Sequence, residues 1–229
     1  MDEGLNQRLR YIEPHIDRLV ENLGRIYNLV RVHEQFHGGA EIKEEDTHKT
    51  DILRAAVVFV HASLEDFLRS LAATHLPQAG EDVLNTIPLK GLNSSGRPEK
   101  FFLGKLVAHK GKSVEQVIEE SVVQYLERSN YSDVQDIASL LSSIGIDVSK
   151  VNEPFAQLER MMYRRHLIVH RADRLDITIG EKKYAKPLSA EEVDEWINST
   201  RTFMVKVLGQ IRVPETERKL DGAVEESLS

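Results

Sequence analysis

Histidines and arginines stand close together in one late segment of the chain, residues 161–173, which reads MMYRRHLIVHRAD. Apolar residues recur there at helical spacing, and at about 100° per residue Arg165 falls inside the apolar arc. His166 lies at the edge of that arc, and His170 follows one turn later on the same face. The arc comprises Phe155, Leu158, Met161, Met162, Ile168 and Val169. A guanidinium in a core-facing stripe is costly unless it is paired or opens onto a polar cavity.

This combination of residue types suits phosphate chemistry. A neutral imidazole accepts a proton at neutral pH, and an adjacent Arg binds a phosphate, so one site can do both. The alternative is structural: Arg165 pairs with a buried carboxylate, and the histidines are packing residues. A metal site is not expected, because Leu167 stands where an H-E-x-x-H protease needs Glu and Arg165 repels a cation. No cofactor is expected.

The elements that must position these residues are almost all helices. Periodic apolar residues predict helices over 4–35, 51–75, 114–127, 133–143, 152–172 and 190–211. Pro14 is expected to bend or break the first. Capping-box patterns start three others, at Ser113, Ser132 and Ser189. A small β-hairpin is expected over 175–187. The fold class is therefore all-α, a single domain over 1–212 with an acidic tail at 213–229.

The second predicted helix carries a polar edge beside a wide apolar face. Arg54, His61, Glu65 and Arg69 form this edge. Glu65 could orient His170 or pair with Arg165, and Asp66 competes with it for that role. The alternative is an exposed row of ion pairs, each contributing only about 0.2–1 kcal/mol.

A long irregular insertion over about 77–112 interrupts the helical pattern. Its part 90–112 holds six Lys or Arg against one Glu, with Gly and Ser spacing. Its candidate RNA contacts are Lys100, Lys105, Lys110 and Lys112, and Phe101 and Phe102 could stack on bases. The alternative is a solvated loop whose two Phe pack into the bundle.

Composition narrows the class of protein. The net charge of −7 argues against a protein that coats nucleic acid through bulk charge. The absence of cysteine excludes disulfides and thiol nucleophiles. Neither a signal peptide nor an apolar run long enough to cross a bilayer is evident, so we expect a cytoplasmic protein without a membrane partner.

The segment from Arg165 to His170 resembles the R-x4-6-H motif of the HEPN superfamily, with four intervening residues and a polar residue, His166, directly after the Arg. HEPN domains are helical bundles that carry this motif late, and the resemblance covers roughly residues 50–210. Arg164 also lies within the permitted spacing of His170. Arg165 is preferred because it faces the apolar arc, whereas Arg164 is expected to face solvent or RNA.

The resemblance implies a HEPN-like bundle with metal-independent endoribonuclease activity, yielding 2′,3′-cyclic phosphate and 5′-OH ends. His170 would be the general base, Arg165 would stabilise the pentacovalent phosphate, and His166 would position the phosphate or act as an acid. Glu65 would complete the catalytic set, and Arg164 and Arg171 would contact RNA.

The resemblance also implies a homodimer with a composite active site. The cellular role would be that of a toxin or antiviral-defence effector with an antitoxin or regulatory partner. Another branch of the superfamily carries a Tyr two residues after the motif His; here Ala172 stands there, which puts a Tyr-based control in doubt. Two alternatives remain open: a non-catalytic module that binds RNA, a nucleotide or a partner protein, and a purely structural dimerisation domain.

Overall fold

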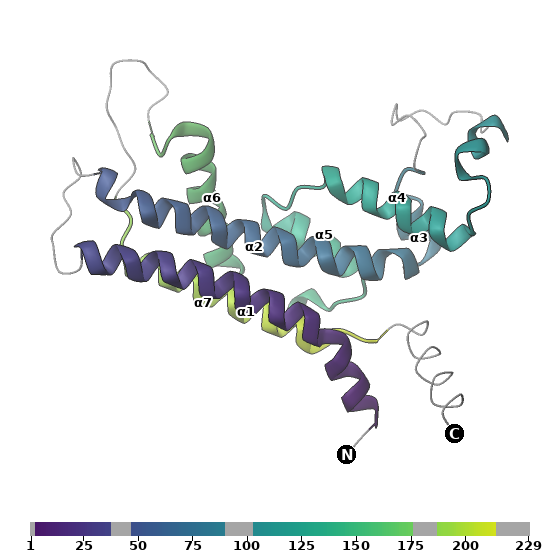
Figure 1. Cartoon of the computed structure of the whole chain (residues 1–229), viewed down its shortest axis with the longest axis horizontal. Coiled ribbons are helices and arrows are strands. Elements are labelled where there is room, and N and C mark those ends of the chain that lie inside the picture. The colour runs from purple at the N-terminus through teal and green to yellow at the C-terminus, as the bar shows by residue number, and fades with distance from the viewer. Residues whose placement is uncertain (1–2, 38–46, 90–102, 176–186, 214–229) are drawn as a thin grey trace.

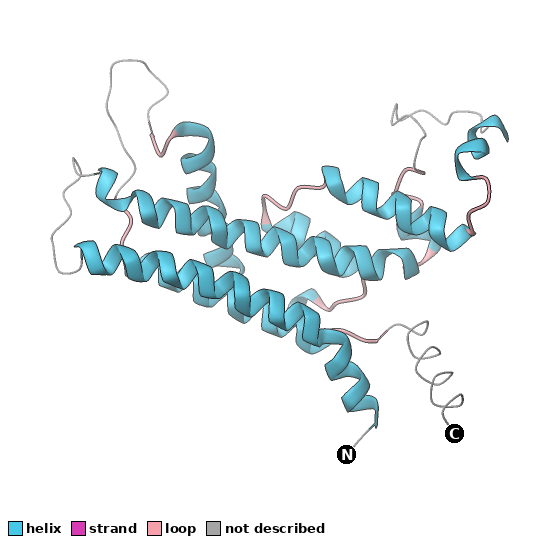
Figure 2. Cartoon of the chain, in the orientation of Figure 1, coloured by secondary structure: helices cyan, strands magenta, loops and turns pink. Residues whose placement is uncertain are grey.

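The protein is an all-α bundle, as expected from its sequence. The computed structural model describes residues 3–37, 47–89, 103–175 and 187–213, and these residues contain no β-strand (Figure 2). The helices are α1 (Glu3–His37), α2 (Asp51–His75), α3 (Glu81–Leu84), α4 (Val114–Arg128), α5 (Val134–Ser143), α6 (Phe155–Arg171) and α7 (Ala190–Gln210). Short 3-10 helices at Thr47–Thr50, Leu76–Gln78, Leu103–His109 and Val148–Lys150 connect them.

Helix α2 is the central element of the bundle. It packs against α1, α4, α6 and α7. Figure 1 shows α1 running along α2, with α7 beside α1, α4 on the other side of α2 and α6 crossing behind α2. The buried apolar residues of α2 are Leu53, Ala56, Val57, Val60, Leu64, Phe67, Leu68, Leu71 and Ala72. Such a wide apolar face buries α2 against several neighbours at once.

Local sequence signals start α4 and α7 as predicted. Ser113 accepts a hydrogen bond from the N–H of Gln116, whose side chain accepts one from the N–H of Ser113, so the capping box is confirmed. Ser189 accepts from the N–H of Glu192 at the start of α7. The prediction for α5 is wrong by one residue. Asp133, rather than Ser132, caps α5, because its carboxylate accepts from two backbone N–H groups.

Pro14 does not break α1, which is continuous from Glu3 to His37. Pro14 is solvent-exposed, and Figure 1 shows the first turns of α1 running at an angle to the rest. A bend of this kind relieves the clash between a proline ring and the preceding turn.

Several predicted features lie outside the described residues. These are the hairpin over 175–187 apart from its ends, the segment 90–102 with Phe101 and Phe102, and the tail from 214 onward. Where the insertion is described, it contains the short helices between α2 and α4. No helix in the described ranges is both long and apolar enough to cross a membrane.

Two histidines contribute polar contacts to the packing of α1 against α2. The Ser70 hydroxyl lies 3.3 Å from Nδ1 of His15, and the Tyr11 hydroxyl lies 3.4 Å from Nε2 of His75. Burial lowers the pKa of both histidines, with further lowering by Arg18 at His15 and by His15 at His75. Both rings are therefore neutral where α1 and α2 pack together.

These lowered pKa values predict that acid weakens the fold. Above pH 7 the histidines are neutral in the folded and unfolded chain, so their contribution is complete. Below the ordinary pKa of 6.5, the unfolded chain binds protons first, and stability falls with pH. We expect a lower urea midpoint at pH 5.5 than at pH 7.5. The double variant His15→Gln, His75→Gln should lose less on acidification; an unchanged pH dependence would contradict this origin.

Candidate functional site

Helix α6 presents the arginine and histidines on two different sides. Its buried residues are Leu158, Met161, Met162 and Leu167. Arg165 is half-buried among them, as the sequence predicted, whereas His166 and His170 are exposed. The prediction of Val169 as a core residue is wrong, because its side chain is 47% exposed. The last turns of α6 therefore extend past the core, and their outer face is open to solvent.

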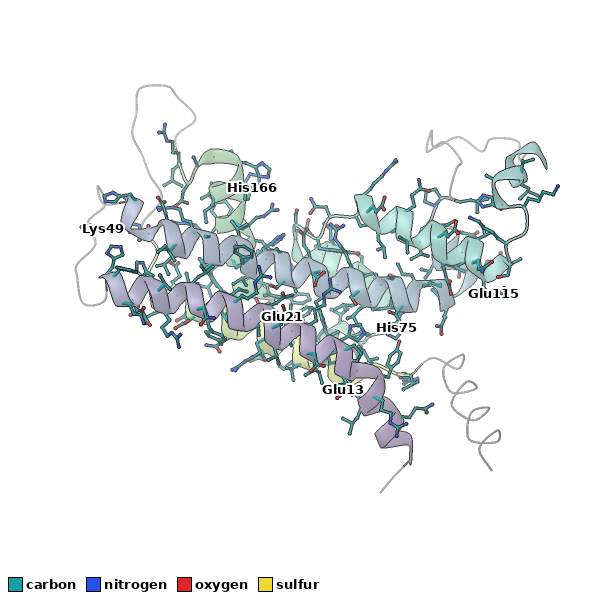
Figure 3. All side chains as sticks on the ribbon, viewed as in Figure 1. Glu13, Glu21, Lys49, His75, Glu115 and His166 are labelled. Atoms are coloured by element: carbon teal, nitrogen blue, oxygen red, sulfur yellow. The ribbon has the colours of Figure 1, made fainter. Side chains whose placement is uncertain are left out.

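The two histidines form one surface pair. Their ring centroids lie 4.8 Å apart, with the ring planes tilted by 46°. Figure 3 shows His166 on α6, across α2 from Glu13 and Glu21 of α1. Both imidazoles can exchange protons with a substrate that approaches this face, because neither is covered.

Arg165 lies close enough to His61 of α2 for its charge to act on that ring, and Glu65 is a second charged neighbour of His61. His61 is buried, and its Nδ1 lies 3.8 Å from a carboxylate oxygen of Glu65. Burial lowers the pKa of His61; the Glu65 carboxylate partly offsets this, and the Arg165 charge lowers it further. His61 is thus neutral at neutral pH, and a neutral imidazole can neighbour a guanidinium without repulsion.

The Nε of Arg165 is buried and has no hydrogen-bond partner within the described part of the chain. A buried donor left without a partner costs about 1–3 kcal/mol. The sequence left open that Arg165 pairs with a buried carboxylate. No such ion pair is present among the described residues, although the Glu65 carboxylate lies beside the neighbouring His61. Such an unmatched guanidinium is suited to binding an anion.

The structure distinguishes Glu65 from Asp66. Asp66 turns toward α1, where a carboxylate oxygen lies 2.6 Å from a guanidinium nitrogen of Arg18. Glu65 lies beside His61, whose pKa also reflects the charge of Arg165. Of the two carboxylates, Glu65 is therefore the one near His61, and it stays the candidate partner of Arg165. The alternative of an exposed row of ion pairs on α2 is wrong, because Arg54 and His61 are both buried.

The expectation that Arg164 faces solvent or RNA is also wrong. Its guanidinium lies 2.8 Å from Oδ2 of Asp173, and its side chain is only 11% exposed. Nε of Arg54 donates to the same oxygen at 2.7 Å. Arg54 also pairs with Asp51 at 3.0 Å. We call Arg54, Arg164 and Asp173 the buried clamp. It ties the end of α6 to the first turn of α2.

The backbone at Asp173 is unusual. Ala172 and Asp173 both have positive φ, at 49° and 62°. Their two N–H groups donate to the carbonyl of Leu167 and so close the helix end. A left-handed conformation costs a non-glycine residue roughly 1–2 kcal/mol. These two residues turn the chain sharply, and the Asp173 carboxylate reaches the two arginines.

Two residues near the motif, Asp173 and His61, are not among the site residues predicted from the sequence. Asp173 lies beyond the helix, and helical periodicity cannot predict a left-handed turn at an Ala-Asp pair. His61 carried a usable signal, its position one turn before Glu65. The sequence could not predict that Arg165 of α6 lies near His61 of α2.

The two predicted RNA-contacting lysines whose side chains are described, Lys110 and Lys112, lie away from α6. Lys112 pairs with Glu120 of α4 at 2.6 Å, and Lys110 is exposed. Both lie just before α4, whose start at Glu115 stands well away from His166 in Figure 3. Lys100 lies outside the described residues, as does the side chain of Lys105. Arg171, by contrast, is exposed directly after His170.

No group of three or more His, Asp or Glu within the described ranges has the arrangement of a metal site. The positive charge near His61 comes from Arg165. A phosphate could receive hydrogen bonds from the guanidinium of Arg165, while the outer face of α6 offers imidazoles for proton transfer.

Comparison with known families gives a match over most of the chain. The RiboL-PSP-HEPN family model matches residues 21–212, which include α2, α6 and α7. No curated protein and no solved structure matches the chain.

The left-handed backbone at Ala172 predicts an unusual effect of glycine. Ala172→Gly should raise the free energy of unfolding by about 1 kcal/mol, because Gly adopts positive φ without steric cost. Urea unfolding measures the change. As a control, Ala62→Gly in the exposed middle of α2 should lower stability by about 1 kcal/mol. Equal destabilisation by both substitutions would contradict the strained turn.

Proposed function

Since the chain belongs to the RiboL-PSP-HEPN family, we propose that it is a metal-independent endoribonuclease whose site is built on α6. The observation that carries the proposal is that Arg165, unlike the adjacent Arg164, has no ion pair or hydrogen bond of its guanidinium among the described residues, on the helix that exposes His166 and His170. An unmatched cation beside exposed proton acceptors suits the transfer of a phosphoryl group.

In the proposed reaction, His170 takes the proton of a ribose 2′-OH. The 2′-oxygen attacks the adjacent phosphorus, and Arg165 stabilises the added negative charge of the pentacovalent phosphate. The bond between phosphorus and the 5′-oxygen then breaks, and a second imidazole protonates that oxygen. The products are a 2′,3′-cyclic phosphate and a 5′-OH. His166 is the second acid or positions the phosphate.

On the side of α2, the neutral His61 lies near Arg165, and the Glu65 carboxylate lies 3.8 Å from Nδ1 of His61. In this proposal the Arg165 guanidinium binds the phosphate, because it has no ion pair among the described residues. Arg171, exposed after His170, contacts the RNA backbone in this proposal. Lys110, exposed just before α4, contacts a different part of the RNA in this proposal.

A homodimer completes the site in this proposal. Positions five apart on a helix point about 140° away from each other, so Arg165 and His170 of one α6 do not share one face. A second copy facing the first supplies the histidine for the arginine of its partner. The proposed cellular role is that of a toxin or antiviral-defence effector, restrained by an antitoxin or regulatory partner.

The first test is cleavage of RNA in EDTA, with end analysis of the products. Wild-type protein should leave 2′,3′-cyclic phosphate ends. His170→Ala should lower the rate about 10²-fold or more, because the general base is lost. Arg160→Ala, at an exposed position earlier on α6, is the matched control and should cleave normally. Dependence on added metal would refute the mechanism, and RNA binding without cleavage would favour the non-catalytic module.

The adjacent arginines should differ in their effect on stability. Arg165→Ala should lower cleavage about 10²-fold or more, with little loss of stability, because its Nε has no partner among the described residues. Arg164→Ala should destabilise the fold by about 1–3 kcal/mol, because Asp173 loses a buried partner. Urea unfolding and initial cleavage rates measure the two effects. The reverse pattern would assign the motif to Arg164.

A further inference from the structure

The end of α6 is held in a conformation that its own residues do not favour. Ala172 and Asp173 are both left-handed, although neither is glycine. Such backbone persists only where the surrounding structure over-determines it. The contacts of Asp173 provide this, since its carboxylate is 1% exposed and is held by Arg54 and Arg164 through one oxygen.

The buried clamp is a poor device for stability alone. Its charges are all withdrawn from water, and apolar residues of similar volume often stabilise a fold equally well. The second carboxylate oxygen, Oδ1 of Asp173, is buried without a partner among the described residues. The clamp instead fixes the orientation of the end of α6 relative to α2, because one guanidinium from each helix binds the same carboxylate oxygen.

The clamp acts on the part of α6 that carries the histidines. His170 lies three residues before Asp173, in the last turn of the helix, and that turn is exposed. The last carbonyls of a helix have no partner within the helix, so a free end frays. Here the N–H groups of Ala172 and Asp173 hold the Leu167 carbonyl, and Asp173 anchors the turn to Arg54 of α2.

Arg164 links the clamp to the catalytic residues more directly. It precedes Arg165 on α6, and its guanidinium is committed to Asp173. Fixing Arg164 fixes the rotation of α6 about its axis, and that rotation sets Arg165 toward α2 and His170 toward solvent. One carboxylate thereby orients the two halves of the site.

We propose that Asp173 is a positioning residue, which orients His170 and Arg165 by holding Arg164 and Arg54 at the end of α6. The inference rests on the proposed ribonuclease function for its catalytic consequence. Its structural consequence, the fixed orientation of the last turn of α6, can be measured without any activity. Asp173 itself does not contact the RNA, because it is buried.

The experiment compares wild type with Asp173→Asn, which keeps the shape of the side chain and removes its charge. Protein labelled with ¹³C at histidine rings reports on every histidine by NMR. We expect the signals of His166 and His170 to shift and broaden, while those of His15 and His75, which lie between α1 and α2, stay in place. The matched control is Asp66→Asn, which removes an ion pair on the other side of α2 and should leave the His170 signal unchanged.

Kinetics provide the second readout. Asp173→Asn should lower kcat for RNA cleavage about 10- to 100-fold, the usual loss for a supporting residue, with KM within about threefold. If Asp173→Asn fails to fold, Arg164→Lys replaces it, since Lys keeps the charge but loses the planar fork. Unchanged His170 signals in a folded variant would overturn the positioning role. Shifted signals in a protein that does not cleave RNA would uphold positioning and refute the ribonuclease.

Discussion

The burial of α2 among its neighbours is the constraint on which the rest of the structure depends. A helix packed against four others must satisfy every polar side chain it carries, and α2 carries several. Arg54 takes the carboxylate of Asp173 at the end of α6. Arg69 donates to the carbonyls of Leu126 and Ser129 at the end of α4. Each of these bonds fixes the end of another helix, so the core helix also sets the positions of the elements around it.

The same constraint separates two adjacent arginines that the sequence shows as equivalent. Arg164 has a structural partner, because it forms a buried ion pair with Asp173. Arg165 lies near the neutral His61, and the Glu65 carboxylate lies 3.8 Å from that imidazole. The guanidinium of Arg165 has no ion pair among the described residues, and its Nε has no hydrogen-bond partner there. A guanidinium without an ion pair in the fold can bind an anionic ligand, so the proposed phosphate site centres on Arg165.

Helices and their boundaries were predictable because their causes are local. Ser113 and Ser189 start α4 and α7 through hydrogen bonds to residues three positions ahead, and apolar spacing follows from the helical repeat. The error at α5 has a local cause too, since Asp133 competes with Ser132 for the same role and a carboxylate accepts from two N–H groups. Val169 was misplaced for a different reason. Periodicity assigns a side chain to a face, but only packing decides how far along a helix that face stays covered.

The sequence by itself determined the all-α class, the position of most helices, and the arginine–histidine motif that resembles the HEPN superfamily. The family match over residues 21–212 agrees with that resemblance. Only the tertiary structure decided which of the two adjacent arginines pairs with Asp173, which of Glu65 and Asp66 lies beside His61, and which residues hold the Asp173 carboxylate. The physical reason is distance along the chain. Spacing within one helix tells which face a side chain lies on. A partner more than a hundred residues away, such as Arg54 for Asp173, comes into contact only when the helices pack.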